Sequence, residues 1–437
     1  MEVEGAQICE LSERELHEAT VTTPVNIAVV KYWGKRNNDL ILPTNSSISC
    51  TLNQDHLNTK TTVRASSSYT DDRFWLNGIE ETISNSPRLT TVLVTLRAIR
   101  KEKEKTLGPL AEGEKPLSEW KLHIASENNF PTAAGLASSS SGYAALAVCI
   151  SKVLELDLTA SELSKIARRG SGSACRSLYG GFVEWQHGVD PSGEDSCAVS
   201  IAPESHWPEL EALILVVSDV KKSTPSTSGM STTVKTSELF PLRVNEVAPK
   251  RIKQMEQAIL EKDFNSFATI AMKDSNQFHA VCLDTFPPIF YLNDVSRGII
   301  TLVHRFNSQV DPATGEPLGI RAAYTFDAGA NAVIFVLKNN VKELVEYIAS
   351  HFPPATLQPT SVYFPDPFGI FRSADAPTAS GFEEYLKATP KTFELLPTFE
   401  PGSVRRIIHT NIGDGPRNKP CSASLLNVSG MPRRAKD

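Results

Sequence analysis

Short runs of apolar and β-branched residues, separated by turn residues, predict strands along the first third of the chain. Val21 to Val30 is the longest of these runs, and it leads into a polar loop over residues 31–38. Shorter runs predict strands over 48–52, 59–64, 73–76 and 120–126. An Asn77-Gly78 pair marks the turn that follows 73–76. Residues 1–20 show no clear pattern, and we expect a frayed or weakly helical lead-in there.

Apolar residues at helical spacing predict the main helices. Between Tyr143 and Leu154 they recur at three- and four-residue intervals, which predicts an amphipathic helix over 136–155. A capping box, Thr159-x-x-Glu162, begins a second helix that we expect to end near Gly170. Further helices are expected over 87–105, 231–238, 250–261, 263–280, 287–308 and 341–351.

The second half of the chain mixes strands with these helices. Strands are expected over 182–185, 212–218, 324–326, 332–337 and 404–410. A polar linker near 203–208 predicts a boundary between two domains, 1–205 and 206–437. The Pro-rich stretch 352–402 is expected to form long surface loops. Strands that come first and then mix with helices favour an α+β fold in two domains.

Composition and charge narrow the class of protein. The chain has 437 residues, of which 41% are hydrophobic and 22% charged, as in ordinary globular proteins. A net charge of −6 argues against a nucleic-acid-binding protein. No apolar run reaches the ~18 residues of a membrane span, and from the acidic start we expect no signal peptide. The seven cysteines are scattered without a CxxC pair, so we expect reduced thiols in the cytoplasm and no zinc site.

A stretch of small residues before the 136–155 helix is a candidate phosphate-binding loop. It reads Asn129-Phe-Pro-Thr-Ala-Ala-Gly-Leu-Ala-Ser-Ser-Ser-Ser-Gly-Tyr143. Unpaired N–H groups and the helix dipole attract phosphate at a helix N-terminus, and Gly135 lets an anion approach the backbone. The alternative is a helix start that simply packs tightly. The loop is not a Walker A sequence, because that lysine is missing.

Basic residues and one aspartate stand beside small residues elsewhere in the chain. Three basic groups lie next to Gly or Ser, and they comprise Lys31, Lys35 and Arg36, then Lys221 and Lys222, and finally Arg176. Each of these charges alone is equally explained as a solvated surface group, but together they favour an anionic ligand. Asp327 precedes Ala-Gly at a strand end, where it is either a turn former or a carboxylate that points into a cleft.

Six segments together resemble one family of enzymes. Besides the phosphate loop they are Pro24-Val-Asn-Ile-Ala28, Lys31-Tyr-Trp-Gly-Lys-Arg36, Leu42-Pro-Thr-Asn-Ser-Ser-Ile-Ser49, Gly170-Ser-Gly-Ser-Ala-Cys-Arg-Ser177 and Tyr324-Thr-Phe-Asp-Ala-Gly329. They resemble the GHMP kinase superfamily and, within it, the eukaryotic diphosphomevalonate decarboxylases. The resemblance covers nearly the whole chain and keeps the family's order.

This resemblance implies a fold and an activity. The fold would be a two-domain GHMP kinase fold, with an N-terminal nucleotide-binding domain like domain 2 of ribosomal protein S5 and a ferredoxin-like C-terminal domain. The active site would lie in the cleft between them. The activity would be ATP-dependent decarboxylation of 5-diphosphomevalonate to isopentenyl diphosphate in the mevalonate pathway, through phosphorylation of the 3-hydroxyl. ATP as co-substrate, Mg²⁺ and a cytoplasmic homodimer are implied as well.

Two other functions stay open on the sequence. One is a small-molecule kinase of the same superfamily that phosphorylates the hydroxyl and stops. The other is a non-catalytic ATP-binding sensor built on this fold. Retention of Asp327, Lys31 and Arg176 argues against the first, and the undamaged phosphate loop and base argue against the second.

The resemblance also implies roles for residues of this chain. Asp327 would be the base, Lys31 its partner, Arg176 the grip on the substrate carboxylate, and Ser139 the contact to the γ-phosphate and Mg²⁺. The residues expected to bind substrate are Tyr32, Trp33, Gly34, Lys35, Arg88, Ser171, Gly172, Ser173, Ala174, Cys175, Arg176, Ser226 and Thr227. Those expected to bind ATP are Ser126, Asn128, Pro131, Ala134, Gly135, Leu136, Ala137, Ser138, Ser139 and Ser140. Residues 274–279 are interpreted as part of a structural helix.

A few positions depart from the family pattern. Thr23 replaces the usual Ala, Ala330 stands where many relatives have Pro, and Ser140-Ser141 replace small apolar residues. None of these changes removes a proposed catalytic group. We therefore expect altered kinetics at most.

Overall fold

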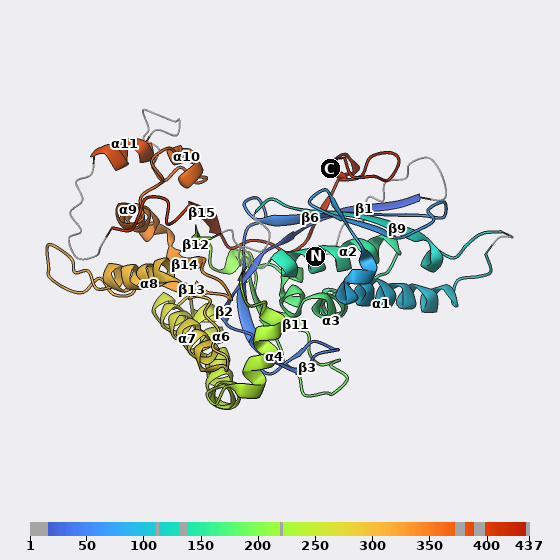
Figure 1. Cartoon of the computed structure of the whole chain (residues 1–437), viewed down its shortest axis with the longest axis horizontal. Helices are drawn as coiled ribbons and strands as arrows, with labels where there is room; N and C mark the ends of the chain where they lie inside the picture. Colours follow the sequence, from blue (N-terminus) through green and yellow to red (C-terminus); the bar gives the residue numbers. More distant parts are fainter. Residues whose placement is uncertain are drawn as a thin grey trace.

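The computed structural model describes residues 16–110, 113–130, 138–218, 222–371, 381–388 and 398–433. One half of it is a six-stranded sheet that carries helices α1 (Pro87–Glu104), α2 (Ser138–Val153) and α3 (Ala160–Gly170) on one face (Figure 1). In spatial order its strands are β16 (Arg417–Lys419), β1 (Leu16–Pro24), β6 (Asn58–Ser66), β9 (Lys121–Asn128), β7 (Arg73–Leu76) and β8 (Ile79–Glu81). All neighbours are antiparallel except β7 and β9, which are parallel.

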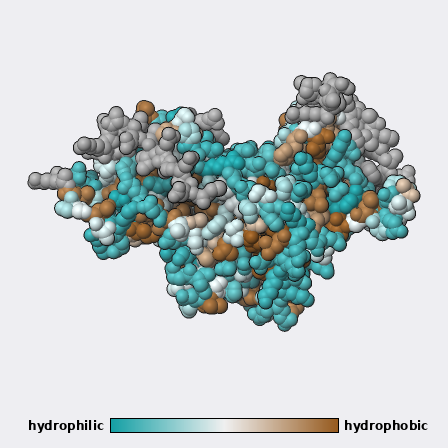
Figure 2. Space-filling model, turned by 180° about the vertical axis from the view of Figure 1, so that it is seen from behind, coloured by the Kyte–Doolittle hydropathy of each residue, from teal (hydrophilic) through white to brown (hydrophobic). Residues whose placement is uncertain are grey.

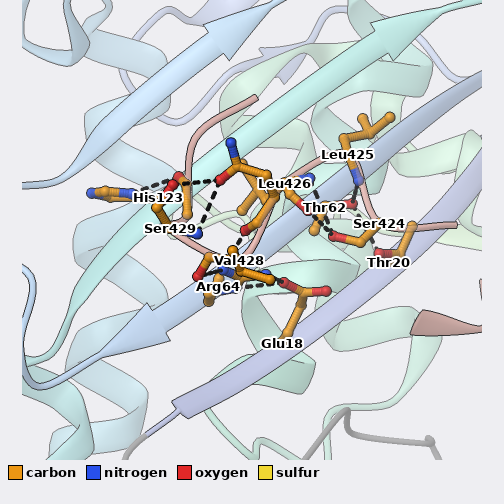
Figure 3. Close-up of polar contacts among 12 residues, drawn as sticks. Glu18, Thr20, Thr62, Arg64, His123, Ser424, Leu425, Leu426, Val428 and Ser429 are labelled. Carbon is orange, nitrogen blue, oxygen red and sulfur yellow. Dashed lines mark hydrogen bonds and ion pairs between the residues drawn. The ribbon is translucent and has the colours of Figure 1, made fainter. Parts of the chain in front are cut away.

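The C-terminal segment, residues 420–433, covers the other face of this sheet. Side chains alternate along β9, so Leu122 and Ile124 face the helices while Ala125 packs against Leu425 and Leu426 of that segment. Figure 3 shows the polar contacts that hold the segment in place. Arg64 pairs with Glu18 inside the sheet and also donates to the carbonyls of residues 427 and 428.

Two smaller sheets complete the strand framework. One is antiparallel, in the order β11 (Ala198–Ala202), β10 (Phe182–Trp185), β5 (Ser47–Thr51) and β2 (Asn26–Val30). The other, also antiparallel, has the order β13 (Ala322–Phe326), β14 (Ala332–Leu337), β12 (Leu210–Val216) and β15 (Arg406–Asn411). A short hairpin pairs β3 (Lys35–Asn37) with β4 (Leu42–Pro43).

Of the helices in the second half, α6 (Ala248–Glu261) and α7 (Phe264–Asp284) pack between these two sheets. The other described helices of this half are α4 (Ser226–Thr236), α5 (Phe240–Leu242), the π-helical turn Arg243–Val247, α8 (Asp294–Asn307), α9 (Val341–His351), α10 (Thr360–Tyr363) and α11 (Gly381–Ala388). Helix α7 contacts β13 on one side and β2 on the other. One hydrophobic core therefore runs from β2 and β5 through α6 and α7 to the third sheet.

Several predicted elements are confirmed, among them the Asn77-Gly78 turn with φ values of 52° and 84°. The ranges of β7, β10, β14 and α9 coincide with the prediction. The Thr159 capping box is also present, with both of its hydrogen bonds. Short 3-10 turns span Ile83–Asn85, Leu117–Glu119, Gly172–Leu178, Glu204–His206, Lys338–Asn340 and Cys421–Ala423.

Other expectations are wrong, for identifiable reasons. Residues 16–20 are strand rather than helical lead-in, because the buried side chains of β1 include polar ones such as Glu18, which hide its pattern. The helix expected from 287 begins only at Asp294, because the side chain of Asn293 caps it at Ser296. Strand β11 was not expected, and the stretch 352–402 contains α10 and α11.

Two further features differ from the sequence picture. Cys421 is disulfide-bonded rather than reduced, since scattered spacing does not show which thiols a fold brings together. The other described cysteines are free, as expected, and they are Cys50, Cys149, Cys175, Cys197 and Cys282. The boundary near residue 205 stays a prediction, but the chain after β15 returns to pair β16 with β1 of the first sheet.

None of the described helices combines the length and apolar character that a bilayer crossing requires. The face seen in Figure 2 is mostly hydrophilic, with small scattered hydrophobic groups.

Candidate active site

The segment that follows β2 begins the site. Trp33 is buried, its indole N–H donates to Thr233 at 3.0 Å, and it packs against Phe278. Gly34 has a φ of +97°, and a Cβ there would lie 2.4 Å from the ring of Phe240. Because only glycine fits this turn, Gly34 lets the chain reverse and brings Lys35 back toward a cavity that Lys31 also lines.

Lys31 and Asp327 form an ion pair across 296 positions of sequence. The Lys31 Nζ lies 2.6 Å from Asp327 Oδ1 and also donates to the Ala28 carbonyl at 2.7 Å. The Lys31 side chain is 3% exposed, whereas that of Asp327 is 29% exposed. The carboxylate therefore keeps one side open while its charge is balanced from the protein side.

The turn that carries Asp327 is held at several points. The Gly329 N–H donates to the Asp327 carbonyl at 2.7 Å, which makes the turn tight. Ser296 donates to the Ala330 carbonyl at 2.8 Å, and Lys222 donates to the Ala328 carbonyl at 3.2 Å. These bonds restrain the turn from Asp327 to Ala330.

Arg176 is buried and anchored on one side of its guanidinium. Its Nε donates to Asn26 Oδ1 at 3.2 Å and to Ser49 Oγ at 2.9 Å, and its Nη1 donates to Ser47 Oγ at 2.5 Å. Its Nη2 has no hydrogen bond to the described part of the protein. Because the residue lines the cavity that also contains Asp327, this nitrogen is free to bind an anionic ligand.

These groups line one cavity of about 410 Å³. Its basic side chains are those of Lys31, Lys35, Arg88, Arg176 and Lys222. Asp327 is the one acidic residue in the described lining. Such an excess of positive charge in a small concave space attracts a polyanion, in spite of the acidic balance of the whole chain.

Two helix N-termini add to this field. Ser138 and Ser139, which begin α2, line the cavity, and so do Ser226 and Thr227 at the start of α4. Arg88 donates to Thr227 at 2.7 Å and so connects α1 with α4. The free N–H groups of a helix N-terminus favour phosphate, so both helices suit phosphoryl groups.

Most of the predicted site residues are brought together here. Those that line the cavity are Lys31, Tyr32, Trp33, Lys35, Arg88, Ser138, Ser139, Ser171, Gly172, Ser173, Arg176, Ser226, Thr227 and Asp327. Those that do not are Gly34, Ser126, Asn128, Ser140, Ala174 and Cys175, the last two being buried in hydrophobic clusters. Pro131, Ala134, Gly135, Leu136 and Ala137 lie outside the described residues. The role of each residue stays a prediction.

Burial changes the acidity of two of these groups. The pKa of Lys35 is lowered to about 8, mainly by burial and further by Arg88. Burial raises the pKa of the Tyr32 phenol far above its usual value, so this side chain stays neutral. The Tyr32 hydroxyl has no hydrogen-bond partner among the described residues, and its ring packs edge-on against Trp185.

Two residues that shape this cavity were not among the predicted site residues, although Lys222 belonged to a basic group that favoured an anionic ligand. Lys222 donates to Ser226 at 2.7 Å, and burial lowers its pKa although nearby Asp327 opposes that shift. Asn26 holds Arg176 in place. The signal for Asn26 was a single amide inside an otherwise apolar strand, and the signal for Lys222 was its place in a basic and Ser-rich loop.

Family models match both halves of the chain. Residues 23–198 match the diphosphomevalonate decarboxylase-like N-terminal domain, and residues 212–419 match the mevalonate 5-diphosphate decarboxylase C-terminal domain. The chain belongs to the diphosphomevalonate decarboxylase family. Because both models match in the expected order, family membership extends over both sides of the cavity.

Relatives and solved structures agree with this assignment. A diphosphomevalonate decarboxylase from Ganoderma lucidum is 50% identical over 96% of this chain and 100% of that protein. A crystal structure of mevalonate 5-diphosphate decarboxylase is 45% identical, with a TM-score of 0.79 over 94% of this chain and 99% of that one. A third, described as MDDEF in complex with MVAPP, AMPPCP and magnesium, is 29% identical, with a TM-score of 0.68 over 92% and 99%. The two-domain GHMP kinase fold is thereby confirmed.

Thr23 and Ser141, both expected to depart from the family pattern, contact each other under the start of α2. The buried hydroxyl of Thr23 donates to the Ser141 carbonyl at 2.7 Å, and the Ser141 hydroxyl lies 2.6 Å from that of Thr59. Thr59 in turn donates to Asn128 at 2.6 Å. This network ties the first turn of α2 to β1, β6 and β9.

We expect Thr23→Ala to lower the free energy of unfolding by about 1 kcal/mol, because a buried hydrogen bond is lost. The shift of the urea midpoint measures this change. The control is Thr90→Ala on α1. It removes an exposed hydroxyl that donates to the Ser86 carbonyl, and it should change the midpoint little. Equal midpoints for the two variants would contradict the stabilising role of the network.

Proposed function

We propose that this protein catalyses the ATP-dependent decarboxylation of 5-diphosphomevalonate to isopentenyl diphosphate, with release of ADP, phosphate and CO₂. The observation that carries the proposal is the cavity whose described lining holds five basic side chains around one carboxylate, that of Asp327. A substrate with a diphosphate and a carboxylate, next to a triphosphate, needs such a surplus of cations. Membership of the diphosphomevalonate decarboxylase family supports the same reaction.

The first step is phosphoryl transfer to the 3-hydroxyl. Asp327 orients this hydroxyl and accepts its proton while the oxygen attacks the γ-phosphorus and the bond to ADP breaks. Lys31 lies 2.6 Å from this carboxylate and balances the charge near the reacting oxygen.

The second step removes the new phosphate and CO₂. The C–O bond to phosphate breaks with its electron pair, and the pair of the bond between C1 and C2 forms the double bond as CO₂ leaves. The free side of the Arg176 guanidinium binds the C1 carboxylate and holds its plane for this loss. Because Asn26, Ser47 and Ser49 hold the other side, the guanidinium needs little reorganisation.

The remaining lining residues divide between the two polyanions. Lys35, Arg88 and the start of α4 bind the substrate diphosphate, and the start of α2 binds the triphosphate of ATP. The cavity also offers oxygen ligands that suit Mg²⁺, a hard cation. They include the Asp327 carboxylate and the Ser139 hydroxyl. When bound, the metal neutralises charge on the phosphates.

The reaction is tested by mixing the protein with ATP, Mg²⁺ and 5-diphosphomevalonate and following CO₂ and ADP together. Equal yields of both are expected. ADP without CO₂ would instead identify a kinase that stops after phosphorylation. Release of neither product, with ATP still bound, would identify a nucleotide sensor.

The lowered pKa of Lys35 predicts a pH dependence of substrate binding. The ammonium is charged below about pH 8 and neutral above it, so the dissociation constant of 5-diphosphomevalonate should rise by up to about tenfold per pH unit above pH 8. Calorimetric titrations between pH 7 and 9.5 measure this. Lys35→Arg stays charged throughout and should bind with nearly constant affinity. A wild-type profile as flat as that of the arginine variant would refute the assignment.

The assembly and location follow from the family resemblance alone. We propose a homodimer in the cytoplasm. Light scattering after size-exclusion chromatography should give twice the chain mass of 47.8 kDa. A monomer mass at micromolar concentration would contradict the dimer.

A further inference from the structure

The backbone N–H and carbonyl of Lys31 are held by side chains, two of them from the other half of the chain. Its N–H donates to Asp274 Oδ2 at 2.7 Å, and its carbonyl accepts from Arg243 Nη2 at 3.0 Å. Asn45 donates to the same carbonyl at 3.1 Å. Because β2 ends at Val30, the Lys31 peptide has no partner in the sheet ladder, and these side chains satisfy it instead.

Arg243 and Asp274 are themselves a fully buried ion pair. The two guanidinium nitrogens Nη1 and Nη2 lie 3.0 Å from the two carboxylate oxygens, and both side chains are 0% exposed. Arg243 begins the π-helical turn before α6, and Asp274 lies in the middle of α7. The pair thus links two helices of the second half to the end of β2.

Stability alone is a weak reason for such a pair. Burying two charges carries a desolvation cost that a well-packed apolar pair does not have. Buried ion pairs therefore commonly contribute little net stability. An apolar pair, however, could not bind the N–H and the carbonyl of Lys31 at once. Short π-helical segments also occur frequently at functional sites.

Fixing this peptide determines where the Lys31 ammonium lies. The side chain leaves a backbone held at both polar atoms, and Nζ then contacts the Ala28 carbonyl and Asp327 Oδ1. A shift of about 1 Å in a reacting group can lower a rate on the order of 10²-fold. If the backbone of Lys31 were no longer restrained, its ammonium would shift and its contact with Asp327 would change.

We propose that Arg243 and Asp274 are positioning residues that act through Lys31 to set its contact with Asp327. The inference rests on the proposed function, since it assigns a positioning role for the same reaction. A neighbour provides a natural comparison. Arg251 also pairs with Asp274, at 3.0 Å, but has no hydrogen bond to Lys31.

A double-mutant cycle in the full-length protein separates positioning from general support of the fold. Asp274→Asn should lower kcat on the order of 10²-fold while the KM for ATP changes by less than about threefold. In a Lys31→Met background the same change should alter the remaining kcat by less than about twofold, because its route of action is already gone. An equal loss in both backgrounds would overturn the inference.

Two further variants keep the test decisive. Arg251→Met removes a charge from Asp274 without touching Lys31, so its kcat should stay within about threefold of wild type. An Arg251→Met loss as large as that of Asp274→Asn would overturn the inference. If Asp274→Asn does not fold, Arg243→Lys replaces it in the same cycle with the same expectations. The lysine keeps the positive charge but cannot make the paired N–H contacts of the guanidinium. Near-normal kcat for Lys31→Met would instead contradict the proposed role of Lys31 itself.

Discussion

Asp327→Asn should lower kcat by about 10³–10⁴-fold while ATP binds with nearly unchanged affinity. The amide has almost the shape of the carboxylate, but it cannot accept a proton at neutral pH and it leaves the Lys31 ammonium unpaired. The Lys31 Nζ, now 2.6 Å from Asp327 Oδ1, is buried and would lose its counter-charge. Joint release of ADP and CO₂ measures kcat, and fluorescence titration with an ATP analogue measures the affinity.

The control for this prediction is a second aspartate away from the cavity. Asp284 ends α7 and accepts from Ser237 at 2.6 Å, so it has a structural bond but no contact with the site. Asp284→Asn should retain most of the wild-type kcat. Retention of more than a tenth of kcat by Asp327→Asn would contradict its role as the base.

Arg176→Gln is expected to reduce kcat by about 10²–10³-fold and to leave the affinity for ATP much less changed. The glutamine cannot bind a carboxylate through two parallel N–H groups, so the plane of the C1 group is no longer held for the loss of CO₂. Steady-state measurements with varied ATP and varied 5-diphosphomevalonate separate the effects on kcat and on the two KM values.

Arg168 offers a matched control for the loss of a buried guanidinium. It is 3% exposed, as is Arg176, and it donates to the carbonyls of Gly193 and Ser196 rather than facing the cavity. Arg168→Gln should lower the free energy of unfolding while kcat stays close to the wild-type value. A defect of Arg176→Gln confined to ATP binding would refute its carboxylate role.

Local patterns were sufficient wherever a short-range rule decides the structure. The capping box at Thr159 needs only a hydroxyl and a carboxylate three residues apart, and the Asn77-Gly78 turn needs only residues that tolerate positive φ. Strand β14 is apolar throughout because it is the second strand from the edge of a buried sheet, which leaves an unmistakable run. Such elements could be predicted without knowledge of their neighbours.

Elements whose partners lie far away in sequence escaped prediction. Strand β1 buries Glu18 and Thr20, and this is possible only because Arg64 and Thr62 of β6 lie opposite them, under the C-terminal segment (Figure 3). Strand β16 has three residues and pairs with β1 across almost the entire chain. A local window contains neither partner.

The candidate site shows the same division. The types of residue at 31, 176 and 327, together with the motifs around them, were enough to predict the chemistry from the sequence alone. Tertiary structure decided that Lys31 and Asp327 touch, that Lys222 and Asn26 join the cavity, and that Arg243 and Asp274 hold the Lys31 peptide. Chemical identity belongs to single residues, whereas distance and burial arise only when separate segments pack around a common core.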